Sequence, residues 1–223
     1  MAPPLKLYNH SLAPNPRRVR IFAAEKGIEL ALEEVDILAG QSRTPEFLGK
    51  NSSGAVPVLE LDDGSYLSES VAICRYFEEL YPDPPLFGRS PEEAGVIMRV
   101  ICEYQAYIEP HLTRIVGAVF FGDADLGADE ITAAMHAVAS EARTIEARLA
   151  KSDWIVGESC SAADMVIFPG IQLLRRALEK PQAAALSSRF MPVEVNYPAL
   201  GRWLARVAAL PGYERTYPPH WRT

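Results

Sequence analysis

The sequence predicts two domains in series, a mixed α/β domain followed by an all-helical one. In residues 1–81, short alternating apolar runs typical of strands interchange with longer helical patterns. Beyond residue 91 the strand pattern disappears and apolar residues recur at helical spacing. A proline-rich run, Tyr-Pro-Asp-Pro-Pro-Leu-Phe-Gly, separates the two patterns and favours neither element. These observations predict domains at 1–81 and 92–223, joined by a linker at 82–91.

The first domain is expected to hold a four-stranded mixed sheet with helices on its faces. The alternation of apolar residues marks the strands, a 3.6-residue spacing marks the helices, and Asp-Gly between two apolar runs signals a hairpin. The expected elements are strands at 4–8 and 30–37, helices at 16–26 and 70–80, and a hairpin turning at Asp63-Gly64.

The second domain shows helical patterns at 92–120, 129–150, 161–178 and 197–210. Pro110 lies inside the first of these and predicts a kink there. Ser161 and Asp164 have the spacing of a capping box, which stabilises a helix start and predicts a structural role for both residues.

Composition excludes several classes of function. The 223 residues include 22 basic and 29 acidic side chains, a net charge of −7, and 48% of the residues are hydrophobic. Because no basic run or aromatic-interleaved basic patch occurs, neither nucleic acid nor an anionic membrane is an expected partner. No apolar stretch approaches the roughly 18 residues that a membrane span needs. We therefore expect a soluble, cytoplasmic protein.

Three cysteines, Cys74, Cys102 and Cys160, are too few and too widely spaced for a disulfide framework or a zinc site. No C-x-x-C motif of the redox-active type occurs. Cys74 lies in an apolar helical pattern, so the prediction is packing rather than catalysis.

The most informative stretch runs from Val56-Pro57 to Ser68-Glu69-Ser70. A proline that opens a strand can adopt cis, which would turn the backbone of Val56 outward to pair with an extended ligand. The Ser-Glu-Ser triplet comes where the next helix begins, and helix starts present free N–H groups to a carboxylate. Together these features predict a site for a small anionic peptide.

This arrangement resembles the glutathione S-transferase family, whose thioredoxin-like domain binds glutathione as co-substrate. The resemblance places the cysteinyl backbone of glutathione at Val56, before Pro57, and its gamma-glutamyl end at Glu69 and Ser70. It also implies a homodimer and a role in detoxification. The other segments that carry the resemblance are 5–8, 15–22, 154–157 and 161–164.

Glutathione chemistry requires a donor that stabilises the thiolate, because an unperturbed cysteine thiol has a pKa of about 8.5. The loop at 8–17 offers Tyr8, His10, Ser11 and Asn15. The position that holds serine in many serine-type relatives is Ala13 here, so the prediction is Ser11, slightly ahead of Asn15. Asn15 is also expected as the N-cap before Pro16. Tyr8 is expected to pack, although it resembles the tyrosine of other classes, and His10 is expected to face solvent.

The sequence leaves open which residue binds the glycine carboxylate of glutathione, because Ala55 stands where many relatives carry a basic residue. The candidates are Gln41, Arg43 and Lys50. The second substrate would lie against a stripe at helical spacing, Tyr104, Ile108, His111 and Ile115, which core packing also explains.

The resemblance implies a glutathione transferase that conjugates the glutathione thiolate to a small, apolar electrophile. Two alternatives stay open: a glutathione-dependent disulfide reductase, and a module of the same fold that binds glutathione or a protein without turnover. The maleylacetoacetate isomerase branch is disfavoured because its serine- and cysteine-bearing first loop is absent.

Overall fold

The computed structural model describes residues 4–122 and 127–222. The chain divides into two compact units, one built from residues up to Leu86 together with those from Leu210 onward, and one spanning Phe87–Ala209. The expected all-helical domain at 92–223 included the last 14 residues, whereas contacts group these residues with the first unit. The reason is that the C-terminal segment packs on the first helix of the chain.

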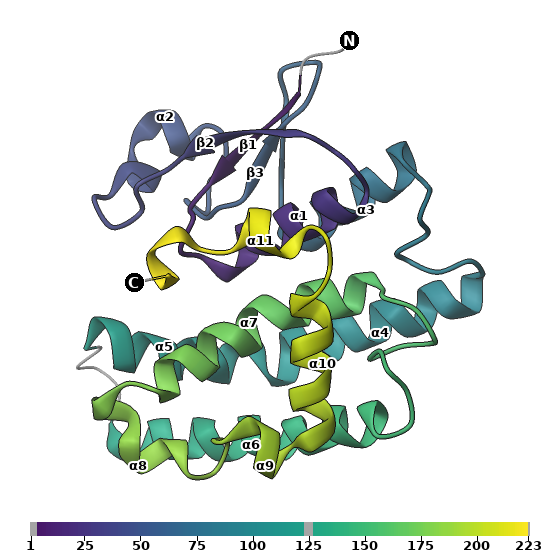
Figure 1. Ribbon diagram of the computed structural model, residues 1–223. Helices are drawn as coiled ribbons and strands as arrows, with labels where there is room; N and C mark the ends of the chain where they lie inside the picture. The colour runs from purple at the N-terminus through teal and green to yellow at the C-terminus, as the bar shows by residue number, and fades with distance from the viewer. Residues whose placement is uncertain (1–3, 123–126, 223) are drawn as a thin grey trace. The chain divides into compact units, whose positions relative to one another are not determined.

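The first unit is a four-stranded sheet in the order β2-β1-β3-β4 (Figure 1). Strand β1 pairs parallel with β2 and antiparallel with β3, and β3 pairs antiparallel with β4. The strands are β1 (Leu5–Asn9), β2 (Leu30–Glu34), β3 (Val58–Glu60) and β4 (Tyr66–Ser68). Strand β2 ends at Glu34, three residues before the predicted bound.

Helices α1 and α3 contact each other beside the sheet, and α2 lies at its other side (Figure 1). Leu7 and Leu59 are fully buried on one sheet face, while Tyr8 and Val58 belong to a cluster with Phe47 on the opposite face. The helical elements are α1 (Pro14–Glu25), η1 (Gln41–Arg43), α2 (Pro45–Leu48), α3 (Ser70–Leu80), α11 (Tyr213–Thr216) and η3 (Pro219–Trp221).

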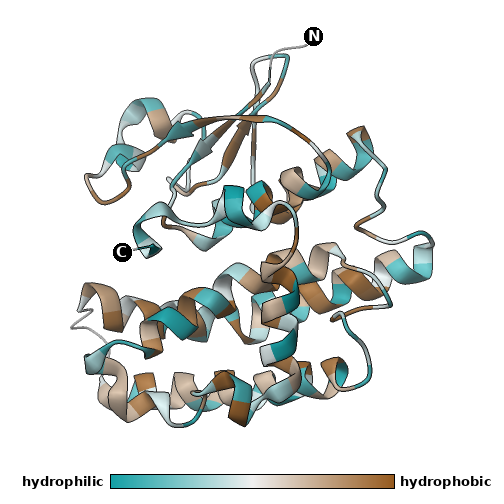
Figure 2. Cartoon of the chain, viewed as in Figure 1, coloured by the Kyte–Doolittle hydropathy of each residue, from teal (hydrophilic) through white to brown (hydrophobic). Residues whose placement is uncertain are grey.

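The described part of the second unit is helical. Its elements are α4 (Pro91–Tyr107), α5 (Glu109–Phe121), α6 (Ala128–Leu149), α7 (Ala162–Leu178), η2 (Pro181–Ala183), α8 (Ala184–Ser187), α9 (Val193–Asn196) and α10 (Pro198–Ala208). Hydrophobic and hydrophilic residues alternate along these helices, as Figure 2 shows. The expected single helix at 92–120 is two helices, interrupted at Ile108 (φ −113°, ψ −53°), two residues before Pro110, which has no N–H to donate.

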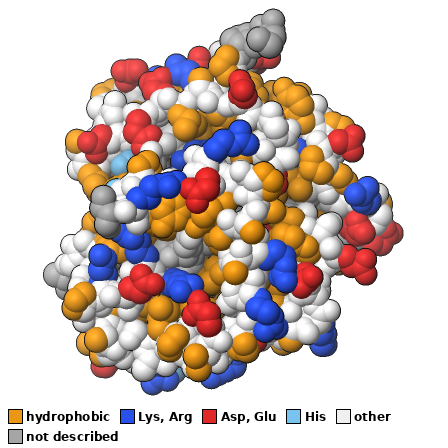
Figure 3. Space-filling view, viewed as in Figure 1, with side chains coloured by type: hydrophobic (Ala, Val, Ile, Leu, Met, Phe, Trp, Pro, Cys, Tyr) orange, Lys and Arg blue, Asp and Glu red, His pale blue; other side chains and the backbone are white. Residues whose placement is uncertain are grey.

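The fold class, a thioredoxin-like unit followed by a helical one, is confirmed. No helix among the described residues combines the length and the apolar character needed to cross a membrane. Figure 3 shows acidic, basic and hydrophobic side chains interspersed over the visible face of the molecule.

Candidate functional site

The loop after β1 is held by Glu34 at the end of β2. The Glu34 carboxylate accepts hydrogen bonds from the backbone N–H of Ser11 and, at 2.5 Å, from Nδ2 of Asn9. Burial opposes ionisation of Glu34, but these donors outweigh it and hold the pKa of the carboxyl below its ordinary value. The carbonyl of Ser11 accepts from Nη2 of Arg20 at 3.5 Å. Both ends of the Ser11 backbone are therefore fixed.

The Ser11 hydroxyl accepts a long hydrogen bond of 3.4 Å from Nδ2 of Asn9. The Ser11 side chain also hydrogen-bonds the Glu34 carboxylate, and this contact is one of the causes of the lowered pKa of Glu34. A serine hydroxyl is one donor and two acceptors, so a ligand atom such as a sulfur would compete with Glu34 for the Ser11 hydrogen.

Asn15 lies one turn further along the chain and is not the N-cap that the sequence predicts. Helix α1 begins at Pro14, with Ala13 as N-cap, because a proline fits the first helical position and Pro14 reaches it before Pro16 does. Asn15 therefore sits inside the first turn. Its Oδ1 is buried and has no hydrogen-bond partner in the described part of the chain.

The side chains of His10 and Tyr8 both bond to other groups of the protein. His10 was expected to face solvent, but it is buried, and its Nδ1 donates to the carbonyl of Val35 at 2.9 Å. The Tyr8 hydroxyl donates to Oε2 of Glu60 at 2.9 Å, and its ring meets Phe47 edge-on. Burial, together with the hydrogen bond to the Glu60 carboxylate and against the opposing effect of Lys6, raises the pKa of Tyr8 to about 12. These contacts give Tyr8 a packing role.

Glu69 and Ser70 form the junction between β4 and α3. Glu69 is exposed and has φ 69° and ψ 112°, the single positive φ among the described non-glycine residues. Ser70 is buried, and its Oγ accepts a hydrogen bond from Nη1 of the buried Arg18 at 3.5 Å. The constrained backbone thus places an exposed carboxyl group at the start of α3.

The Val56-Pro57 peptide bond is cis, as the sequence analysis allowed. The Val56 side chain packs with Tyr8 and Phe47 in one buried cluster. Neither the N–H nor the C=O of Val56 bonds to another backbone group among residues 4–122 and 127–222. This peptide edge is available to pair with an extended ligand.

Each candidate for the glycine carboxylate already has a protein contact. Lys50 forms a 3.3 Å ion pair with Glu46. Gln41 accepts from the backbone N–H of Asp36 at 2.8 Å through Oε1. Arg43 donates to the carbonyl of Ser53 at 2.9 Å. A ligand carboxylate would therefore share or displace one of these contacts.

The sequence analysis missed Arg17, a buried arginine of α1, the helix that follows the loop after β1. The Arg17 guanidinium lies 5.3 to 5.6 Å from the ring centres of Tyr213, Tyr217 and Trp221, which belong to the C-terminal segment of the same unit. Burial, followed by repulsion from Arg17, lowers the pKa of Arg20 to about 10. The three aromatic residues recur every four positions, but no local sequence pattern pairs them with Arg17.

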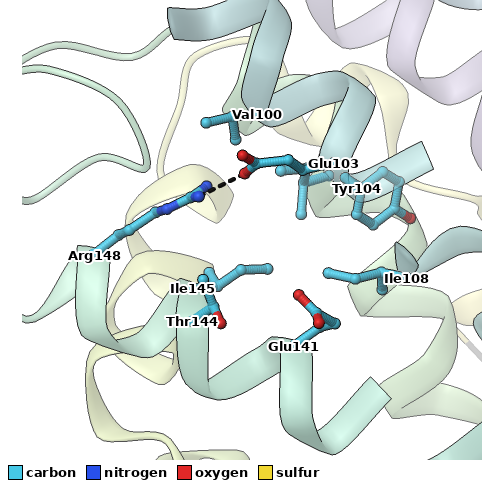
Figure 4. A pocket seen from close by; sticks show the side chains of 9 residues that line it. Val100, Glu103, Tyr104, Ile108, Glu141, Thr144, Ile145 and Arg148 are labelled. Atoms are coloured by element: carbon cyan, nitrogen blue, oxygen red, sulfur yellow. Dashed lines mark hydrogen bonds and ion pairs between the residues drawn. The ribbon is translucent and has the colours of Figure 1, made fainter. Parts of the chain in front are cut away.

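The helical stripe predicted for the second substrate is mostly core. Tyr104, Ile108 and Ile115 are buried, whereas His111 is half-buried and its Nδ1 has no hydrogen-bond partner among the described residues. Tyr104 and Ile108 line a cavity of about 20 Å³, which has room for about one water molecule. Figure 4 shows this cavity, closed at one side by the Arg148–Glu103 ion pair at 2.5 Å.

Cys74 is fully buried, and burial raises the pKa of its thiol. A buried thiol of this kind is a poor nucleophile, which agrees with the predicted packing role. In the described ranges, no group of three or more His, Cys, Asp or Glu side chains is placed to hold a metal ion.

Known proteins share both units. The family model for the glutathione S-transferase N-terminal domain matches residues 13–80, and the model for the C-terminal domain matches residues 105–211. Glutathione S-transferase 2 of Saccharomyces cerevisiae is 30% identical over 221 residues, which cover 94% of this chain and 88% of the yeast protein. Maleylacetoacetate isomerase of Pseudomonas aeruginosa is 28% identical over 181 residues, covering 77% and 82%.

Solved structures share the fold. The crystal structure of poplar glutathione transferase F1 matches with a TM-score of 0.84 at 21% identity, over the full length of both chains. Gtt2 from Saccharomyces cerevisiae matches with a TM-score of 0.79 at 27% identity, over 95% of this chain and 99% of that one.

A thioredoxin-like unit with an open peptide edge and a carboxylate at a helix start, combined with a helical unit, defines a class of glutathione-dependent proteins. The chain belongs to the glutathione S-transferase family, which confirms the resemblance found in the sequence.

Proposed function

We propose that this enzyme transfers glutathione to a small, apolar electrophile. The observation that carries the proposal is Glu69, an exposed carboxylate held at positive φ immediately before the buried Ser70. There it meets the ammonium of the gamma-glutamyl group, while free N–H groups of the first turn of α3 meet the carboxylate. The cysteinyl backbone pairs with Val56.

The chemical step begins when the glutathione thiol loses its proton to solvent. The thiolate then attacks an electrophilic carbon, so that an S–C bond forms and either a leaving group departs with its electron pair or a double bond takes up the charge. The protein lowers the barrier by stabilising the anion before the attack. A single donor that shifts the thiol pKa by one unit contributes about 1.4 kcal/mol.

Ser11 is the proposed donor, because its backbone is fixed at both ends and its hydroxyl, which also contacts the Glu34 carboxylate, lies on the loop after β1. Asn15 is the second candidate, since its side chain lies in the first turn of α1, where the helix dipole also favours an anion. The two residues are separable by mutation, because they lie on the loop and on the helix respectively.

The test is an absorbance titration of the thiolate of glutathione bound to the wild-type enzyme, to Ser11→Ala and to Asn15→Ala. We expect a bound thiol pKa well below that of free glutathione, raised by about one unit in Ser11→Ala. If Asn15→Ala alone raises it, Asn15 is the donor, and turnover of a glutathione mixed disulfide would then favour the reductase. If the pKa of the bound thiol is unshifted, or if glutathione binds without turnover, the alternative that remains is a binding module.

The remaining partners are also part of this proposal. The electrophile would contact the helical unit through His111, the member of the predicted stripe that keeps an exposed portion. The enzyme would act as a cytoplasmic homodimer in detoxification. Sedimentation equilibrium tests the dimer directly, and a monomer mass at micromolar concentration would contradict it.

A further inference from the structure

A polar hollow of about 320 Å³ opens on the helical unit, outside every residue discussed so far. It lies where α6 meets the segment containing α8 and α9, elements that gather at the lower edge of the view in Figure 1. The residues that line it are His136, Ala139, Arg143, Ser188, Arg189, Asn196 and Tyr197. Polar and basic groups make up most of this lining, which distinguishes the hollow from the small cavity in Figure 4.

The hollow is built on a buried tyrosine. The Tyr197 hydroxyl lies 3.1 Å from the carbonyl of Ala139 on α6 and 3.4 Å from the carbonyl of Arg189, so it can donate to either. Its ring packs against Phe190, with 5.3 Å between ring centres. Nδ2 of Asn196 donates to the carbonyl of Met191 at 3.0 Å. These contacts fasten the Arg189 backbone to α6 and fix the shape of the hollow.

Positive charge converges on the hollow without an acidic partner. Within the described part of the chain, neither Arg143 nor Arg189 forms an ion pair, and no carboxylate lines the hollow. The Glu146 carboxylate, about one turn along α6 from Arg143, accepts from the backbone N–H groups of Ala199 and Leu200. This arrangement stands out in a chain whose net charge is −7.

His136 completes the basic group. Nη1 of Arg189 lies 3.4 Å from Nδ1 of His136. Because a guanidinium can only donate, Nδ1 of His136 is the acceptor in this contact. The hollow therefore presents guanidinium N–H donors, and its lining contains no carboxylate.

We propose that this hollow binds a small phosphorylated molecule, at a site separate from glutathione. A phosphomonoester dianion would accept from the planar guanidinium groups of Arg143 and Arg189. The Asn196 amide and the Ser188 hydroxyl would contact the uncharged remainder of the ligand. A volume of about 320 Å³ is within the range of small-molecule sites and too small for a folded partner.

The test is calorimetric titration of the full-length protein with glycerol phosphate, with inorganic phosphate and with sodium acetate at matched ionic strength. We expect saturable binding of glycerol phosphate with a Kd on the order of 1 mM or tighter, weaker binding of inorganic phosphate, and none of acetate. Arg143→Gln and Arg189→Gln should each weaken binding at least about tenfold, the cost of one lost charge-assisted hydrogen-bond pair. Both side chains are exposed, so both variants should fold.

Arg202→Gln is the matched control, since Arg202 is an exposed arginine of α10 outside the lining and should leave the Kd unchanged. Binding that survives both Arg143→Gln and Arg189→Gln overturns the proposal, as does an absence of saturable binding up to about 10 mM. Equal binding of acetate would show general anion screening and would overturn it as well. Glutathione conjugation is not involved in any of these measurements, so failure of the proposed enzymatic function would leave them interpretable.

Discussion

At the scale of single residues, the site depends on two backbone positions that the fold constrains. Ser11 is held through its N–H by Glu34 and through its C=O by Arg20. Glu69 is held by its place between β4 and α3, at a φ of 69° that L-residues adopt at a cost of roughly 1–3 kcal/mol. The proposed contact with glutathione gives a reason for a glutamate to keep such a conformation, because a glycine there would be less strained.

Glu69 therefore allows a prediction that separates stability from binding. Glu69→Gly should raise the free energy of unfolding by about 1 kcal/mol, since glycine tolerates positive φ, while glutathione affinity falls. Glu69→Gln should leave the free energy of unfolding nearly unchanged. It should lower the affinity for glutathione by a factor similar to that of Glu69→Gly. Urea denaturation and glutathione titration measure the two effects. If Glu69→Gly weakened the fold instead, the positive φ would not be a source of strain.

At the scale of elements, the first loop is positioned by the register of two strands. Asn9 and Glu34 are Cα partners in the parallel β1–β2 pair, so the Glu34 carboxylate lies beside the residues that follow β1. This pairing explains why Glu34 receives donors from both Asn9 and Ser11. The strand register thus places an anchor for the loop that contains the proposed donor.

This anchor predicts a pH dependence. The folded-state pKa of Glu34 is below its unfolded value of about 4.3, so its contribution to stability is fully present above that pH and is lost as pH falls through the folded pKa. Glu34→Gln should therefore be less stable than wild type at neutral pH, and the difference should shrink below about pH 4. Urea midpoints from pH 7 to pH 3 measure it, and hydrogen exchange at the Ser11 amide should be faster in the variant. A difference that stays constant with pH would show that the carboxylate charge is not involved.

The start of α7 depends on one carboxylate. Asp164 is fully buried and accepts from the N–H and the hydroxyl of Ser161, from the N–H of Ile155 and from Nε1 of Trp203. Asp164→Ala leaves these donors buried without an acceptor and should cost roughly 3–5 kcal/mol in unfolding free energy. Asp164→Asn keeps oxygen acceptor capacity and should cost less. Thermal unfolding compares the two, and equal losses would contradict the proposed role of the hydrogen bonds.

Local patterns predicted the elements whose causes are local. The Ser161–Asp164 pairing, the hairpin at Asp63-Gly64 and α3 at 70–80 follow from short-range chemistry, and the structure has all three. The start of α1 was misjudged because two prolines compete for the first helical position. Near the expected kink at Pro110, the helix is interrupted at the single residue Ile108.

At the scale of the whole molecule, the order of the segments along the chain differs from their division between the two units. The segment from Leu210 onward follows the helical unit in the sequence but belongs to the first unit. The backbone N–H of Gly212 donates to Oε1 of Glu25 at 3.0 Å, and a Cβ at Gly212 would come within 2.5 Å of the Ala24 Cβ. Contacts of this kind join residues about 190 positions apart, so no short-range sequence pattern predicts them.

The C-terminal segment should accordingly stabilise α1, which carries Asn15 and Arg17. Trp221→Ala removes one of the three rings around the Arg17 guanidinium, each worth about 0.5–2 kcal/mol when desolvated. We expect a lower unfolding temperature and faster hydrogen exchange of the α1 amides. Trp154→Ala is the matched control, since Trp154 also lies near an arginine, Arg206, but in the helical unit. Equal effects of both substitutions on α1 exchange would contradict a specific link between the C-terminal segment and α1, whereas an effect of Trp221→Ala alone would show that the end of the chain supports the helix next to the proposed sulfur donor.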